Sequence, residues 1–74
     1  MELKIIVPGI LIYDIPKNKD VLRVKVHRAL EQIKAEKIQT SAWRSENLQE
    51  LIKIALMIRN AGCEAIVLEE KRIL

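Results

Sequence analysis

The spacing of apolar and polar residues changes along this chain, and each change marks an expected element. Residues 10–15 (Ile-Leu-Ile-Tyr-Asp-Ile) are almost continuously apolar and rich in β-branched side chains, which is typical of a buried central strand. The apolar run begins at residue 3, but Pro8-Gly9 interrupts it, and proline cannot donate a hydrogen bond to a central ladder. We expect the first residues to form either a bulged extension of this strand or a separate edge piece.

Residues 20–35 have the period of an amphipathic helix. Its apolar stripe consists of Leu22, Val26, Ala29, Leu30 and Ile33. Arg23, His27 and Lys34 line one edge of that stripe. A polar turn at 16–19 precedes the helix, and Asn18 or Asp20 could cap it.

Residues 37–43 alternate with a period of two, which predicts one strand with two unlike faces. Ile38, Thr40 and Ala42 form one face. Gln39, Ser41 and Trp43 form the other, where Gln39 and Ser41 could line a site, although a polar strand face is the commoner explanation.

A second helix is expected from Asn47 to Ala61. Asn47 and Glu50 have the spacing of a capping box, and Gly62 suits the left-handed position after the helix. Apolar residues cover most of its circumference, namely Leu48, Leu51, Ile52, Ile54, Ala55, Leu56, Met57 and Ile58. A helix of this kind is buried on more than one side, and so short a chain has too little sheet for that. A partner chain is therefore implied.

Residues 64–68 (Glu-Ala-Ile-Val-Leu) predict a third strand, so the expected order is strand, helix, strand, helix, strand. The 74 residues leave room for one domain, 1–74. A core of this size supplies only about 3–5 kcal/mol without a disulfide, a metal or a partner. This second argument also favours a homodimer.

Composition narrows the class of protein. Half of the residues are apolar, and the only aromatic residues other than His27 are Tyr13 and Trp43, too few for a base-stacking platform. Cys63 is the only cysteine, so we expect a reducing compartment and interpret Cys63 as a small core residue. The start lacks the order of a signal peptide and no stretch has the length of a membrane span, which favours the cytoplasm.

The net charge of +3 favours polyanionic partners slightly. No zinc-ligand spacing, phosphate-binding glycine loop or nucleophile elbow is present, which argues against nucleotide hydrolysis and acyl transfer.

Three groups of residues resemble a known family. They are Ile12-Tyr13-Asp14-Ile15-Pro16, then Arg23 with Lys25-Val26, then Ile38-Gln39-x-Ser41-Ala42-Trp43. Together they resemble the small CRISPR-associated ribonuclease and spacer-acquisition family, conventionally numbered two. Ser45-Glu46-Asn47 is similar to the related virulence-associated protein D ribonucleases.

The resemblance implies a ferredoxin-like α+β domain that forms a homodimer. It implies that Asp14 from each subunit meets at a site on the twofold axis, where the pair would hold Mg²⁺ for cleavage of nucleic acid. Members of the family act as metal-dependent endoribonucleases or as non-catalytic scaffolds that hold DNA beside an integrase.

The chain departs from the family pattern in three places. Trp43 replaces a phenylalanine, a glycine before the second strand is missing, and almost no residues remain for a further strand between Trp43 and the second helix. The sheet could therefore be three parallel strands of an α/β fold, or a neighbouring subunit could complete it.

The candidate catalytic and metal-binding residue is Asp14, for which a plain turn aspartate is the competing interpretation. A carboxylate suits Mg²⁺, and a metal-bound water could attack a phosphodiester. Candidate nucleic-acid-binding residues are Lys17, Lys19, Arg23, Arg28 and Arg44, with Arg23 favoured because it follows Asp14 closely and matches the family motif.

His27 could act as a general base, but with no partner evident in the sequence we interpret it as a surface or boundary residue. The alternative function is a non-catalytic interaction module that docks partners through the apolar second helix.

Overall fold

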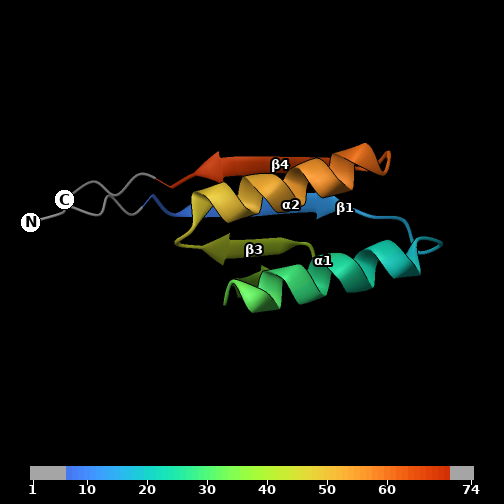
Figure 1. Ribbon diagram of the computed structural model, residues 1–74, viewed down its shortest axis with the longest axis horizontal. Coiled ribbons are helices and arrows are strands. Elements are labelled where there is room, and N and C mark those ends of the chain that lie inside the picture. Colours follow the sequence, from blue (N-terminus) through green and yellow to red (C-terminus); the bar gives the residue numbers. More distant parts are fainter. Residues whose placement is uncertain (1–6, 71–74) are drawn as a thin grey trace, which may run out of the picture.

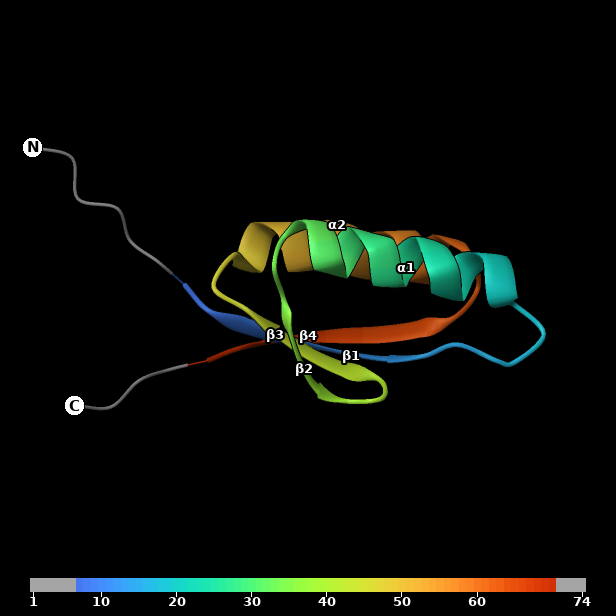
Figure 2. The ribbon, with the colours of Figure 1, turned by 90° about the horizontal axis from the view of Figure 1, so that it is seen from below.

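The apolar segment after Pro8 forms an inner strand of a four-stranded antiparallel sheet. The computed structural model describes residues 7–70. Its strands are β1 (Gly9–Asp14), β2 (Glu36–Gln39), β3 (Ala42–Ser45) and β4 (Glu64–Glu69). Its helices, α1 (Asp20–Gln32) and α2 (Leu48–Asn60), both lie on one face of the sheet (Figures 1 and 2).

The strand order is β2-β3-β1-β4, and every pair of neighbours is antiparallel. Each helix therefore connects two strands that have another strand between them: β3 lies between β1 and β2, and β1 lies between β3 and β4. The three-stranded parallel alternative is wrong, because no parallel pair occurs among the described strands.

The prediction of one strand over 37–43 is also wrong. The chain reverses at Thr40-Ser41, so this segment contains most of a hairpin, and β3 supplies the strand that seemed to be missing. Alternation with a period of two continues on both sides of a tight turn, which is why the pattern did not reveal the reversal. A register shift places Lys37 opposite Trp43 and Gln39 opposite Ala42. Gln39 thus does not share a face with Trp43.

The core lies between the helices and the sheet. Its buried members are Leu11, Val26, Leu30, Trp43, Leu51, Ile54, Ala55, Ile58 and Ala65. The stripe predicted for α1 is confirmed, since Val26 and Leu30 are buried and the other three residues pack against the core. Helix α2 buries one side within the chain, whereas Ile52 and Leu56 stay 38% and 54% exposed.

The helix ends follow local rules in part. The Asn47 side chain accepts a hydrogen bond from Glu50 N, and Gly62 has φ 84°, so the Asn47 cap and the left-handed Gly62 are confirmed. The other half of the capping box is wrong, because Asn47 N donates to the Ser45 hydroxyl and the Glu50 carboxylate accepts from Lys53. The predicted side-chain cap of α1 is wrong, because Lys19 occupies the cap position and no side chain caps that helix. The Cys63 side chain is partly buried against the core. Residues 1–6, expected as a strand extension or edge piece, lie outside the described residues.

Candidate functional site

Helix α1 and strand β2 do not close tightly on each other. All four residues of β2 are exposed, and Lys37, opposite the buried Trp43, is the side chain that β2 places on the helix side of the sheet. A lysine keeps its ammonium group in water, so β2 contributes no fully apolar side chain to pack against α1. The result is a cleft of about 450 Å³, here called the α1–β2 cleft. Its lining consists of Tyr13, Arg23, Val24, His27, Arg28, Glu31, Lys37 and Thr40.

Aromatic residues hold the inner wall of this cleft. Trp43, only 4% exposed, donates from Nε1 to the Tyr13 hydroxyl at 3.2 Å. The His27 ring meets the Trp43 ring edge-on, with centroids 5.3 Å apart and planes at 83°. Because the Tyr13 oxygen serves as the acceptor, its own proton can still be donated to a ligand.

The charge of the cleft is predominantly positive. Arg23, Arg28 and Lys37 line it, and within residues 7–70 none of the three has an ion-pair partner. Its one carboxylate, Glu31, pairs with His27 one helical turn away. Glu31 follows His27 by one helical turn in the sequence, so this partner could have been predicted from the spacing. Three cations beside a hydroxyl donor can bind an oxyanion. The planar guanidinium groups of the two arginines can each donate two parallel hydrogen bonds to a phosphate.

The structure separates the five predicted nucleic-acid-binding residues. Only Arg23 and Arg28 reach the α1–β2 cleft. Lys17 lies exposed in the turn before α1, and the Lys19 ammonium donates to the Ala61 carbonyl at 2.8 Å.

Arg44 lies outside the α1–β2 cleft and forms an ion pair with Glu70. Its Nε donates to a Glu70 carboxylate oxygen at 2.7 Å, and this hydrogen bond and charge raise the pKa of the Arg44 guanidinium. Tyr13, Lys37 and Thr40 were missed as site residues. The sequence held no signal for Lys37, because its place opposite Trp43 depends on the cross-strand register of the β2–β3 hairpin.

Asp14 does not line this cleft. Within β1 it alternates with the buried Leu11 and the cleft residue Tyr13, so it belongs to the sheet face away from the helices. Its cross-strand neighbour is Glu64, which is also exposed.

No group of three or more His, Cys, Asp or Glu suited to a metal occurs in residues 7–70. Mg²⁺ is often held by one or two carboxylates plus water and substrate phosphate. Asp14 and Glu64 are two carboxylates placed opposite each other on neighbouring strands.

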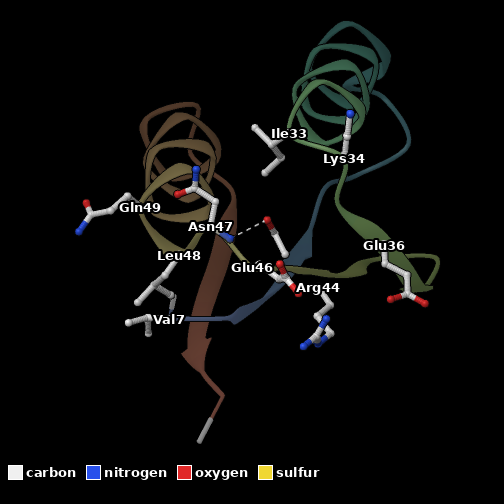
Figure 3. Close-up of a pocket in the computed structure, with 10 residues that line it drawn as sticks. Val7, Ile33, Lys34, Glu36, Arg44, Glu46, Asn47, Leu48 and Gln49 are labelled. Atoms are coloured by element: carbon white, nitrogen blue, oxygen red, sulfur yellow. Dashed lines mark hydrogen bonds between the residues drawn. The ribbon is translucent and has the colours of Figure 1, made fainter. Parts of the chain in front are cut away.

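A larger cavity, about 820 Å³, lies between the end of α1 and the start of α2 (Figure 3). At the start of α2, Asn47 N donates to the buried Ser45 hydroxyl at 3.0 Å, and Leu48 N donates to the Val7 carbonyl. Glu36 and Glu46 also line this cavity. The cations of its lining, Lys34 and Arg44, are balanced by these two carboxylates, and Arg44 pairs with Glu70. It therefore suits an anion less well than the α1–β2 cleft.

Comparisons with models of protein families, with curated proteins and with solved structures found no match to this chain. Among residues 7–70, no helix has the length and apolar character needed to cross a membrane.

Proposed function

We propose that this protein binds the sugar–phosphate backbone of nucleic acid in the α1–β2 cleft. The observation that carries the proposal is a set of three cations around one cleft, Arg23, Arg28 and Lys37, none of which has an ion-pair partner in the described part of the chain (7–70). Each can contact a phosphate oxygen, and the Tyr13 hydroxyl adds a neutral donor. Contacts of this kind position a strand without reading its sequence, so we expect binding to be largely independent of sequence.

We further propose that the fold is ferredoxin-like. The strand order β2-β3-β1-β4 and the two interleaved β-α-β units support this assignment. So does the placement of both helices on one sheet face (Figure 2).

The binding site is tested by removing its cations one at a time. Arg23→Ala, Arg28→Ala and Lys37→Ala should each weaken binding to a fluorescent oligonucleotide. Each should also lower the slope of log K against log salt by about 0.7–0.9 per phosphate contact, because fewer counterions are released. Fluorescence anisotropy across a salt series gives both quantities.

The matched control is Lys25→Ala. Lys25 is exposed on the same helix and lies outside the α1–β2 cleft, so the variant changes the net charge by the same amount. A Lys25→Ala slope that falls as far as the others would contradict the site. If the parent protein binds no nucleic acid at low salt, the protein-interaction module becomes the better proposal, with the exposed Ile52 and Leu56 of α2 as its docking residues.

A second candidate function is Mg²⁺-dependent cleavage of nucleic acid on the sheet face away from the helices, outside the α1–β2 cleft. The specific observation in its favour is the direct cross-strand pairing of Asp14 with Glu64. These residues would hold the ion, which would activate a water and offset charge on the phosphate. Two like charges in direct cross-strand contact are unfavourable by themselves, and a cation would relieve their repulsion.

Asp14→Asn and Glu64→Gln test this second function. Both substitutions keep the side-chain shape and remove the charge that the ion requires. We expect each to abolish Mg²⁺-dependent cleavage of a labelled RNA or DNA strand while leaving anisotropy in EDTA unchanged. Cleavage that persists in both variants would mean that these carboxylates do not act, and a parent protein that binds without cleaving under any divalent metal would be a scaffold.

A further inference from the structure

The two edges of the sheet differ in how well they resist pairing with another strand. Strand β2 has four residues, a register irregularity and a lysine, which are common means of protecting an edge. Strand β4 has six residues (Glu-Ala-Ile-Val-Leu-Glu) with charges only at its ends, and it contains neither proline nor lysine. An edge of the second kind is suited to accept another strand.

The outward hydrogen-bonding groups of β4 can be identified. Glu70 N donates to the Pro8 carbonyl at 2.9 Å, so residue 70 faces β1. In an antiparallel ladder such residues alternate with residues whose N–H and C=O point away. The outward-facing residues of β4 are therefore Ala65, Val67 and Glu69.

The helix layer beside this edge is apolar. A groove of about 320 Å³ lies between α2 and β4. Its lining consists of Ile52, Ala55, Leu56, Arg59, Ala65, Ile66 and Val67. Ile52 and Leu56 are exposed and lie one helical turn apart, so apolar surface continues from the strand edge onto the helix.

We propose that the β4 edge and α2 pair with a second copy of this chain about a twofold axis at Val67. The β4 strands of the two copies would run antiparallel. In the joined sheet, each β4 residue on the helix side must lie opposite a helix-side residue of the other copy. Centring on Val67 satisfies this condition and places every outward group of Ala65, Val67 and Glu69 in the new ladder, whereas centring on Ile66 would leave those of Glu69 outside the strand pairing.

Charge complementarity favours a second copy as the occupant. Arg59, near the end of α2, lines the groove beside Ala65, and within residues 7–70 it has no ion-pair partner. Glu69 pairs with Gly9, which lies against Leu48 and Leu51 at the opposite end of α2. Within one chain, Arg59 and Glu69 therefore lie at opposite ends of the β4 edge and do not pair with each other. The twofold axis would place Glu69 of each copy opposite Ala65 of the other, on the side of the sheet where Arg59 lies.

Charge reversal tests the pairing, with sedimentation velocity over a concentration series as the measurement. The parent protein should form a dimer at micromolar concentration. Arg59→Glu and Glu69→Arg should each weaken the dimer at least about tenfold, since each places like charges together. The double variant should recover to within about threefold of the parent, because the pair is restored with its signs exchanged.

Val67→Pro is the second variant. It removes an outward N–H while leaving the residues that face β1 unchanged, so a monomer with the parent's circular dichroism is expected. A parent protein that remains monomeric would overturn the proposal. Single reversals without effect, or a double variant that fails to recover, would also overturn it. None of these readouts requires nucleic acid, so the proposed function can fail while the dimer stands.

Discussion

Gly9 shows how one missing side chain sets the distance between two layers. A Cβ built at Gly9 would lie 2.6 Å from the Leu48 Cδ1 and 3.2 Å from the Leu68 carbonyl oxygen. The leucine methyl could rotate away, but the carbonyl belongs to the backbone of β4. Glycine at this position therefore lets α2 approach the sheet closely.

We predict that Gly9→Ala destabilises the protein by about 1–3 kcal/mol through overpacking. The free energy of urea unfolding, measured at several protein concentrations, gives this value. Gly62→Ala is the comparison, because it has nothing within 4 Å and its cost comes only from the positive φ. The loss of unfolding free energy caused by Gly9→Ala should be smaller in a Leu48→Ala background, where the closest contact is gone. The loss caused by Gly62→Ala should be unchanged in that background. A Gly9→Ala protein as stable as the parent would refute the close-approach explanation.

At the scale of elements, the hairpin of β2 and β3 matters most to the site. Strand β3 packs Trp43 into the core, while β2 places Lys37 beside it and remains exposed. The turn between these strands is held to β1, because Tyr13 N donates to the Ser41 carbonyl at 3.1 Å. Tyr13, Thr40 and Lys37 thus come together at one edge, although the sequence places them on what seemed to be two separate strands.

The two edge strands of the sheet differ in composition, which explains why the two edges have different proposed roles. Strand β2 supplies a cation to a cleft and carries features that discourage strand pairing. Strand β4 supplies apolar side chains and outward amides, which another strand can use. Ligand binding and self-association can therefore occupy opposite edges without competing.

At the scale of the whole molecule, the proposed twofold axis would keep both helix layers on one face of a continuous sheet. The α1–β2 clefts of the two copies would then lie at its two outer edges. A nucleic acid long enough to span the dimer could occupy both clefts, and a short one only one.

We predict that affinity rises with oligonucleotide length more steeply in the parent dimer than in the monomeric Val67→Pro variant, which keeps the parent's net charge. The second cleft binds intramolecularly once the first is occupied, so linked binding strengthens the complex without any new contact. Anisotropy titrations with a series of lengths, below and above the span of the dimer, measure this effect. The shortest strand should bind equally to both proteins, and an identical length dependence in both would contradict the arrangement.

The sequence by itself determined the features that depend on neighbours along the chain. The α1 stripe, the Asn47 cap, the left-handed Gly62 and strands near 10–15 and 64–68 follow from periods and capping rules that act within a few residues. Arg23 and Arg28 were found for the same reason, since both lie on one short helix.

The tertiary structure alone decided which distant residues meet. Whether residues 37–43 stay extended or reverse depends on whether β3 finds a place beside β1, and the alternating pattern is the same in both cases. That choice determines the sheet order, brings Lys37 to the cleft, and sets Glu64 beside Asp14. Cross-strand register is a property of long-range packing, so no local spacing contains it.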